Sequence, residues 1–530
     1  MSSFCEHSRP GPEAIECRVP PSPEAQKRID ASRRRLEAGM ALPEKPTADQ
    51  LDLKTLALIL ARPPATRANT LTITRSERAP VTGSRKVIVL LVDFPDKPGT
   101  RSKESIHELL FSRGTFASGS MRDYYAEVSG NRLDVSGEVH GWLRAPQPKS
   151  YYTNGDYGFA AYPRNAQKLV EDVLDLADGV VDFAPFDNDG NGVVEALVVI
   201  AAGSGAEQTL KIDDLWSHKW SITPKTVDGK RVTAYFMAPE DGKVGVMAHE
   251  LGHLLLGMPD LYDIDYGSRG TGSWDLMAAG SWNNNGDTPA HPCAWVKSKV
   301  GWANIDTVFD AERDIALPPY ATSNSVVRVS VGSADGKQYF LLSNRRKLGF
   351  DAHIPGEGLL IEHVDENQQN NTDENHYLVD IEQCDGLRQL NLNQNAGDAG
   401  DAWPAGGQSA FNAGTTPSSK TYDGADSRVD ISAIASAGTG ITARVRAGSD
   451  AGGGGGGFVW HNDRTVTQAF ASADAGNAWV NLAGLGWRRV SPGAADGITN
   501  LFAMLCEALA NGRKAHVYAD ASAVTIAYLD

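Results

Sequence analysis

The stretch VGVMAHELGHLLLG, residues 244–257, decides how this chain is interpreted. It is apolar over most of its length and predicts one buried helix. Its two histidines, His249 and His253, are four residues apart, and on a helix this spacing puts both imidazoles on one face, where they can bind one metal ion. Glu250 follows the first histidine and can act as general base on a metal-activated water. A core helix with two hydrogen-bonded histidines is the alternative.

The sequence identifies the third metal ligand less clearly than it identifies the two histidines. A catalytic zinc ion takes three protein ligands and leaves one position open. No Glu occurs between Glu250 and Glu312, which argues against a Glu ligand from a later helix. Gly257 tolerates the left-handed conformation that ends a helix, and the chain can then turn back towards the histidines. We expect Asp260 as the third ligand and Asp263 as its alternative, with a supporting role in a turn left open for either carboxylate.

The run SWDLMAAGSW, residues 273–282, predicts a methionine turn with Met277 as an apolar floor beneath the ligands. Together with GMPDLYD (257–263) and GSWN (280–283), it resembles the immune inhibitor A family of secreted metalloproteases. Further blocks that resemble this family are WSH (216–218), PAH (289–291), GW (301–302), PGEGLLI (355–361) and GDAGD (397–401). The resemblance spans roughly residues 85–445. It implies a metzincin-like zinc peptidase, protein or peptide substrates, a propeptide and secretion.

One feature departs from the metzincin pattern, which has glycine three residues after the second histidine and the third ligand six residues after it. Here Gly257 is four residues after His253, and Asp260 is seven residues after it. The extra residue is a leucine that lengthens the helix. It would rotate the following residues by about 100° if helical geometry continued, and a loop can absorb that rotation.

Length and patterning predict an α+β protein of several domains. The 530 residues exceed one hydrophobic core. The apolar runs at 85–94 and 197–201 predict buried strands, and they alternate with helical patterns before the histidine helix. We predict a propeptide-like segment (1–80), a metzincin-like zinc peptidase catalytic domain (81–308), a β-rich, sandwich-like domain (309–447), a Gly-rich linker (448–457) and a small accessory α/β module (458–530).

Composition limits the kinds of binding partner and the cellular location that we expect for this protein. The net charge of −16 argues against a nucleic-acid partner. No apolar run approaches the ~20 residues that span a bilayer. The first fifty residues show no basic stretch followed by an apolar one, so no signal peptide is visible, in conflict with the secretion that the resemblance implies. Five sparse cysteines predict no disulfide framework. The sequence leaves the oligomeric state open.

The N-terminal segment contains one candidate for control of the metal centre. Residues 22–39 predict a helix that is polar nearly all round and cannot form a core alone. Cys17 lies in the proline-stiffened stretch ECRVPPS, residues 16–22. Its thiolate could take the open zinc position and keep the enzyme latent. An ordinary cysteine in a loosely packed segment is the alternative.

The stretch DNDGNGVVE, residues 187–195, resembles the start of a calcium loop, because oxygen-bearing side chains alternate and glycine stands at the sixth position. The Glu expected at the twelfth position is replaced by Val198, so this is not an EF-hand. We predict a compact structural Ca²⁺ site, and an Asp/Asn/Gly turn between strands is the alternative. The candidate ligands are Asp187, Asp189, Asn191 and Glu195.

Two functions are compatible with these motifs. The first is a zinc-dependent endopeptidase in which His249, His253 and Asp260 hold Zn²⁺ and Glu250 moves the protons. The second is a calcium-dependent binding or adhesion protein that has kept a catalytically degenerate protease fold. The intact Glu250 favours the enzyme, because a degenerate protease commonly loses the base.

Overall fold

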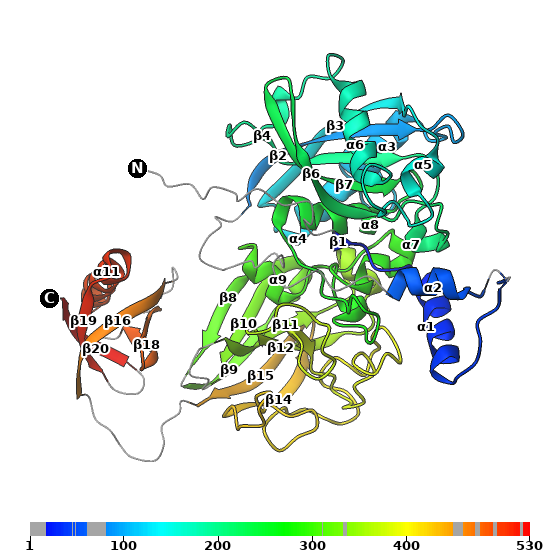
Figure 1. Ribbon diagram of the computed structural model, residues 1–530. Coiled ribbons are helices and arrows are strands. Elements are labelled where there is room, and N and C mark those ends of the chain that lie inside the picture. The colour runs from blue at the N-terminus through cyan, green and yellow to red at the C-terminus, as the bar shows by residue number, and fades with distance from the viewer. Residues whose placement is uncertain are drawn as a thin grey trace.

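The computed structural model is shown in Figure 1. It describes residues 17–44, 46–47, 49–60, 81–309, 311–331, 337–448, 459–471, 477–490, 495–519 and 523–529. Helices and sheets are mixed throughout, which confirms the predicted α+β class.

A seven-stranded sheet organises the part of the chain that contains the histidine helix. Its strand order is β1-β6-β7-β5-β2-β3, with β4 paired to β7. Strands β3, β2, β5 and β7 run parallel to one another, whereas β6 is antiparallel to β7 and β1 is antiparallel to β6. The strands are β1 (Cys17–Arg18), β2 (Gly83–Asp93), β3 (Leu133–Arg144), β4 (Val193–Val194), β5 (Leu197–Ala201), β6 (His218–Val227) and β7 (Lys230–Pro239).

Strand β2 is apolar at successive positions because both faces of the sheet are covered. Val87, Val89 and Leu91 belong to one buried cluster, which also holds apolar residues of α3, α4 and α8. The alternate residues of the strand belong to a second cluster, with α6. These helices are α3 (Lys103–Phe111), α4 (Met121–Val128), α6 (Ala166–Ala177) and α8 (Val244–Leu251).

The short helices of this part of the chain are α5 (Lys149–Thr153), α7 (Ala206–Thr209) and α9 (Ala294–Lys299), and the 3₁₀ segments are η1 (Ala184–Phe186), η3 (Gly272–Trp274) and η4 (Ala279–Gly286). Local sequence fixes the start of α4, where Ser120 and Asp123 form a reciprocal capping box. The hydroxyl of Tyr125 donates to the carbonyl of Ala248 at 2.6 Å. This contact joins α4 to the helix that carries the histidine motif.

The described N-terminal segment, residues 17–60 without 45 and 48, contains α1 (Pro23–Glu37) and α2 (Leu53–Leu60), drawn in dark blue in Figure 1. Helix α1 is polar over most of its surface, as predicted, and it buries one side, which carries both apolar and polar residues, against its neighbours. Its residues Ala25 and Ile29 belong to the same buried cluster as α8. The predicted propeptide-like residues 1–16 and 61–80 lie outside the described residues.

Two further sheets follow. One has the order β13-β12-β11-β10-β8 and the other β14-β15-β9, and apolar residues of both sheets share one buried cluster. Strand β8 pairs in parallel with β10, so it belongs to this region although it precedes the predicted boundary at residue 308. The elements are β8 (Asn304–Val308), β9 (Ala311–Leu317), α10 (Tyr320–Ser323), β10 (Ser325–Ser330), β11 (Gln338–Arg345), η5 (Gly349–His353), β12 (Gly358–Asp365), β13 (Val379–Ile381), β14 (Val429–Ala437) and β15 (Gly440–Ala447).

The C-terminal residues form a closed five-stranded barrel of order β16-β17-β18-β20-β19, with a helix beside it. Its apolar residues form a cluster of their own. Most of the predicted Gly-rich linker, residues 449–457, lies outside the described residues. The elements are β16 (Val459–Ala471), β17 (Ala478–Leu482), β18 (Gly486–Val490), α11 (Ala495–Asn511), β19 (Lys514–Ala519) and β20 (Ala523–Leu529).

Candidate metal centre

The histidine helix differs from the single α-helix that the sequence predicts. Helix α8 ends at Leu251, and a π-helical turn, η2 (Gly252–Leu256), follows it. Gly257 then adopts the left-handed conformation, with φ of 66°. A π-helical turn holds one residue more than an α-helical turn. The extra leucine is therefore taken up by a wider turn, and the following loop is not rotated away from the histidines.

Three atoms that can bind a metal ion lie close together beside this turn. Oδ1 of Asp260 lies 3.1 Å from Nε2 of His249 and 3.1 Å from Nε2 of His253, and the two Nε2 atoms are 3.0 Å apart. Zinc–nitrogen and zinc–oxygen bonds of about 2.0–2.1 Å place tetrahedral donors about 3.3–3.4 Å apart. The triangle is slightly smaller than this, so the residues fit one zinc ion after a small expansion.

The orientation of both rings suits metal binding. Nδ1 of His249 lies 3.0 Å from the carbonyl oxygen of Leu276, and Nδ1 of His253 lies 2.5 Å from that of Met258. Each carbonyl accepts a hydrogen bond from the Nδ1–H of its histidine, which leaves the Nε2 lone pair directed at the shared site. Both histidines are buried.

The electrostatics agree with this assignment of protons. Burial lowers the pKa of His253 and outweighs the opposite effect of Asp260. For Asp260, burial raises the pKa, but the two imidazoles outweigh it and lower the pKa to about 2. Neutral imidazole and ionised carboxylate are the forms that bind a metal ion.

Glu250 is buried beside these donors. Burial, and then the charge of Asp260, raise the pKa of Glu250 well above its ordinary value, and the N–H of Val19 lowers it. Among the described residues, neither carboxylate oxygen of Glu250 has a hydrogen-bond partner of normal geometry. A buried acceptor without a partner is costly in a structural role, and it suits a group that exchanges protons with a substrate or a water.

Asp263, the alternative third ligand, points elsewhere. Its Oδ1 accepts from the N–H of Asp265 at 3.1 Å, and its Oδ2 accepts from the N–H and the hydroxyl of Ser268, both at 2.8 Å. Carboxylate oxygens of Asp263, Asp265 and Glu374 lie within 4.8 Å of one another. Asp263 therefore stabilises the loop that follows Asp260 and does not join the histidines.

Met277 is fully buried, and its sulfur would lie 3.4 Å from a Cβ added to Gly252, close beneath the histidine helix. The N–H of Leu261 donates to the carbonyl of Met277 at 2.9 Å, which ties the Asp260 loop to the methionine turn. The carbonyl of the preceding residue, Leu276, accepts from His249, as described above.

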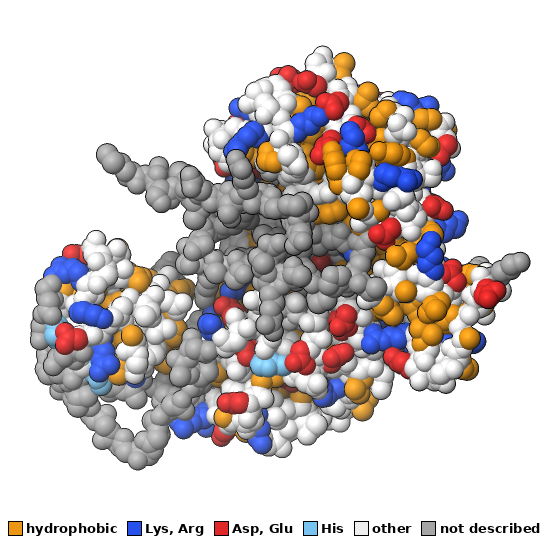
Figure 2. Space-filling model, in the orientation of Figure 1, with side chains coloured by type: hydrophobic (Ala, Val, Ile, Leu, Met, Phe, Trp, Pro, Cys, Tyr) orange, Lys and Arg blue, Asp and Glu red, His pale blue; other side chains and the backbone are white. Residues whose placement is uncertain are grey.

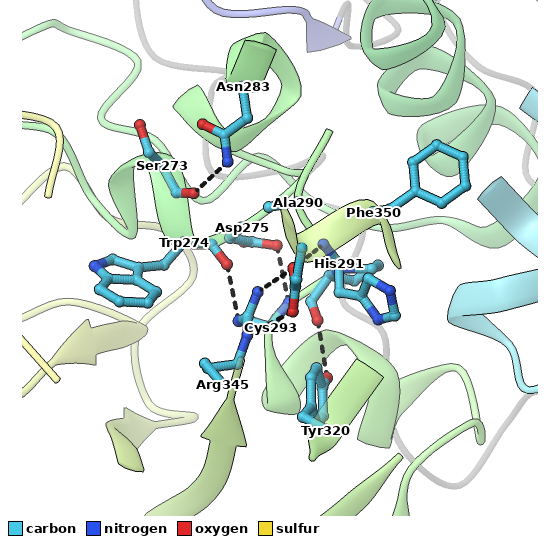
Figure 3. A network of polar contacts seen from close by, with 12 residues as sticks. Ser273, Trp274, Asp275, Asn283, Ala290, His291, Cys293, Tyr320, Arg345 and Phe350 are labelled. Carbon is cyan, nitrogen blue, oxygen red and sulfur yellow. Dashed lines mark hydrogen bonds and ion pairs between the residues drawn. The ribbon is translucent and has the colours of Figure 1, made fainter. Parts of the chain in front are cut away.

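Figure 3 shows the polar contacts that hold the start of this turn. Asp275 Oδ1 accepts from the N–H of Cys293 at 2.9 Å. Arg345 donates to the carbonyl of Trp274 at 2.9 Å and forms a two-pronged, fully buried pair with Asp351 at 2.8 and 3.0 Å. Because Arg345 belongs to β11, the sheet of the following region supports the metal centre.

Comparison with known proteins agrees with this geometry. Residues 76–303 match the family model of the immune inhibitor A peptidase M6 catalytic domain. This part of the chain is similar to the immune inhibitor A peptidases. It is 32% identical to Immune inhibitor A of Bacillus thuringiensis subsp. alesti over 339 residues, which are 48% of each chain. It is 33% identical to the Pre-pro-metalloprotease PrtV of Vibrio cholerae serotype O1 (strain M66-2) over 270 residues.

These alignments leave much of each protein unmatched. The second covers 40% of this chain and 29% of PrtV, so the chain spans about half or less of the length of these two relatives. The family match contains every residue of the candidate metal centre except Cys17.

In this protein, the N-terminal segment reaches the candidate metal centre. Cys17 Sγ, a ring nitrogen of His253 and a carboxylate oxygen of Asp260 lie within 4.8 Å of one another. The carbonyl oxygen of Arg18 lies 3.1 Å from Nε2 of His249 and accepts from the hydroxyl of Tyr262 at 3.0 Å. Burial raises the pKa of Tyr262 well above its usual value, so the hydroxyl keeps its proton.

Sequence reasoning missed three side chains that hold this segment. Besides Tyr262, the indole N–H of Trp216 donates to the carbonyl of Val19 at 2.9 Å, and that of Trp282 donates to the carbonyl of Pro20 at 2.8 Å. All three belong to blocks that resemble the family. The family resemblance identified these sequence blocks, but only the folded structure shows that their side chains hold the N-terminal segment.

The candidate calcium loop brings together three of its four predicted ligands. Carboxylate oxygens of Asp187, Asp189 and Glu195 lie within 4.8 Å of one another. Oδ1 of Asp187 is buried and has no hydrogen-bond partner among the residues that the structure describes, whereas its Oδ2 accepts from Lys230 at 2.7 Å and from the N–H of Gly192 at 3.0 Å. The pKa of Asp187 is lowered, mainly by its hydrogen bond with the Lys230 ammonium.

Hydrogen bonds within the same loop use most of its other oxygens. The two oxygens of Asp189 accept from Asn191, and Asn191 Oδ1 accepts from the N–H of Val193. Both oxygens of Glu195 accept from donors in the loop. The arrangement has features of both predicted alternatives, the ion site and the turn.

No helix in the described part of the chain is long and apolar enough to cross a membrane. On the face shown in Figure 2, acidic and basic side chains are interspersed over the described surface. The net charge of −16 is therefore not gathered into one patch on this face.

Proposed function

We propose that this chain is a zinc-dependent endopeptidase that hydrolyses peptide bonds in proteins, with Glu250 as general base. The observation that carries the proposal is the triangle of His249, His253 and Asp260 donors beside the buried carboxylate of Glu250, for which the described residues offer no hydrogen bond of normal geometry. The similarity to two peptidases supports it, although the chain matches only part of each. Activity and protein substrates for the whole chain are therefore part of this proposal.

The roles follow from position. His249, His253 and Asp260 would hold Zn²⁺, which when bound polarises the substrate carbonyl and makes a water more acidic. Glu250 takes the proton from the attacking water and passes it to the leaving amine. Its raised pKa suits this role, because a base must hold a proton between the two transfers. Met277 packs beneath the ligands and takes no part in the proton transfers.

We also propose that the N-terminal segment keeps the enzyme latent, with the Cys17 thiolate as a fourth zinc ligand. Thiolate binds zinc strongly and would displace the attacking water. The position of the sulfur near His253 and Asp260 supports this role, as does the name of one relative, a pre-pro-metalloprotease. Activation would then require cleavage or movement of this segment.

The proposal also includes a structural calcium site and secretion. The loop with Asp187, Asp189, Asn191 and Glu195 would bind a structural Ca²⁺ ion, supported by the partnerless Oδ1 of Asp187. Secretion is an expectation from the family resemblance, and it can be checked by comparing the culture medium with the cells of the producing organism.

The experiment that tests the function measures zinc by elemental analysis and casein hydrolysis with and without a chelator. Three proteins are compared: the full-length chain, full-length Cys17→Ser, and a chain starting near Ser84. We expect one zinc ion per chain and hydrolysis in the last two, which the chelator abolishes. If none of the three cleaves casein with zinc bound, the degenerate binding protein is the better description.

Activity of the same three proteins tests latency. If truncation activates but Cys17→Ser does not, the segment blocks the site sterically and the thiolate has no role. Full-length protein that is as active as the truncated chain would exclude an inhibitory segment.

A further inference from the structure

The N-terminal segment binds to the edge of the central sheet as an added strand. Within β1, Cys17 pairs with Lys219 and Arg18 pairs with His218, antiparallel to β6. Without β1, strand β6 would be the edge of the sheet. An extended peptide recognises such an edge through its main-chain hydrogen bonds. The edge of β6 next to the metal centre is therefore where a substrate peptide would bind, and β1 occupies it.

One peptide bond of this strand faces the catalytic groups. The carbonyl oxygen of Arg18 lies on the side of the metal ligands, 3.1 Å from Nε2 of His249. The N–H of the next residue, Val19, donates to the carbonyl of Ser217 at 3.4 Å and also acts on the Glu250 carboxylate. A bond that is hydrolysed needs its oxygen at the metal and its nitrogen within reach of the proton carrier. The Arg18–Val19 bond has its oxygen beside a proposed metal ligand, His249, and its nitrogen on the side of Glu250.

The hydroxyl of Tyr262 donates to the same carbonyl oxygen at 3.0 Å. In the transition state of hydrolysis this oxygen gains negative charge, and a fixed donor at that position stabilises it. Tyr262 is fixed by burial and by its stacked neighbour Tyr266, with ring centroids 6.3 Å apart.

The side chains on either side of this bond have different surroundings. The Arg18 guanidinium carbon lies 4.4 Å from the ring centre of Phe159, within the range of cation–π attraction. The Val19 side chain is completely buried. The indoles of Trp216 and Trp282 bind carbonyl groups of the main chain, so they hold any sequence. The sites of the Arg18 and Val19 side chains, which flank the bond, are therefore the ones from which we infer selection between substrates.

We propose that residues 17–20 lie in the cleft as a substrate does, so that the preferred substrates carry a cationic side chain before the cleaved bond and a small aliphatic one after it, and that Tyr262 is a catalytic residue. The inference rests on the proposed peptidase function. In the reaction the water oxygen bonds to the carbonyl carbon, the carbon–nitrogen bond breaks, and Glu250 delivers a proton to the amine. In the latent chain the Cys17 thiolate keeps the water out, and Arg18–Val19 stays intact.

The first test uses the chain itself. Full-length Cys17→Ser is incubated with zinc and followed by mass spectrometry, with Cys17→Ser/Glu250→Gln as the matched control. We expect a new chain that starts at Val19, and only when Glu250 is present. If Cys17→Ser hydrolyses casein but leaves Arg18–Val19 intact, the substrate-like placement is wrong while the peptidase function stands.

The second test uses synthetic peptides with the most active of the three proteins compared above. A quenched peptide containing Ala-Arg-Val-Pro should be cleaved between Arg and Val, at least tenfold faster at low concentration than the same peptide with Glu in place of Arg. Phe159→Leu should raise KM for the Arg peptide and reduce this preference. Casein hydrolysis without any preference for Arg would overturn the specificity, and absence of casein hydrolysis would instead overturn the proposed function.

The third test concerns Tyr262. Tyr262→Phe should lower kcat for the Arg peptide by about 10²-fold, the usual effect of losing one oxyanion donor, with a smaller change in KM and unchanged zinc content. Tyr266→Phe is the matched control, because it removes a hydroxyl from the stacked ring. If the two variants turn over the peptide within a factor of two of each other, Tyr262 has no catalytic role.

Discussion

The two candidate metal sites of this protein are built in opposite ways. The donors of the candidate catalytic centre come from a helix, a π-helical turn and the loop that follows them, and both histidines are held by backbone carbonyls. The donors of the candidate calcium loop come from nine consecutive residues, and that loop satisfies most of its own oxygens. Within the described part of the chain, both sites contain buried carboxylate oxygens without a hydrogen-bond partner of normal geometry, those of Glu250 in the first and Oδ1 of Asp187 in the second.

The comparison shows that metal-ligand side chains can cluster for two different reasons. A buried set of donors without partners is unstable unless an ion or a substrate completes it. A surface loop with internal hydrogen bonds is stable by itself, and Lys230 already balances part of its charge. The catalytic centre should therefore depend strongly on its ligands, and the loop should depend weakly on calcium.

The largest effect is expected at Glu250. Glu250→Gln keeps the size of the side chain but removes the proton carrier, so turnover should fall by about 10²–10⁴-fold while zinc content and the circular dichroism spectrum stay unchanged. Casein hydrolysis by the most active form of the protein is the measurement. A variant that keeps more than a tenth of parental turnover would disprove the role.

Asp260→Ala should have the next largest effect. Loss of a direct ligand should weaken zinc binding by more than the 10–100-fold that is typical of groups behind the ligands. Asp263→Ala is the matched control and should bind zinc like the parent, because Asp263 bonds to its own loop. Parallel zinc titrations decide this, and equal affinities for both variants would place the third ligand elsewhere.

Calcium should have a moderate effect on stability and none on catalysis. If the loop binds Ca²⁺, a concentration of about 100 times the Kd adds about 2.7 kcal/mol, which should raise Tm by several degrees. Asp187→Asn should remove this increase without changing casein hydrolysis. A parent whose Tm does not respond to calcium would identify the loop as an ordinary turn.

Lys230→Met should give the smallest effect on calcium binding. Its effect is opposite to that of Asp187→Asn, because it should strengthen calcium binding. Removing the ammonium frees Oδ2 of Asp187, so calcium should bind more tightly and the rise in Tm should begin at a lower calcium concentration. Calorimetric titration of parent and variant measures this directly. Unchanged or weaker binding would mean that Lys230 does not compete with the ion.

Much of the fold follows from local sequence. The apolar run at 85–94 became β2, because covered faces on both sides of a sheet require apolar residues at successive positions. The run at 197–201 became β5 with the predicted bounds. The error was the single α-helix over 244–257. Sequence periodicity does not distinguish a lengthened α-helix from one that widens into a π-turn, since the choice depends on where the following loop must go.

The sequence by itself determined which groups the candidate site contains: two imidazoles four residues apart, the carboxylate between them, and a glycine that ends the helix. These are relations between near neighbours, and helical geometry fixes them. Tertiary structure alone decided that Asp260 and not Asp263 joins the histidines, that Tyr262 faces a carbonyl oxygen, and that Cys17 and Arg18 pair with β6 beside His249. Contacts between residues as distant as Arg18 and His249 depend on how the sheet and its loops pack, and local sequence carries no record of that packing.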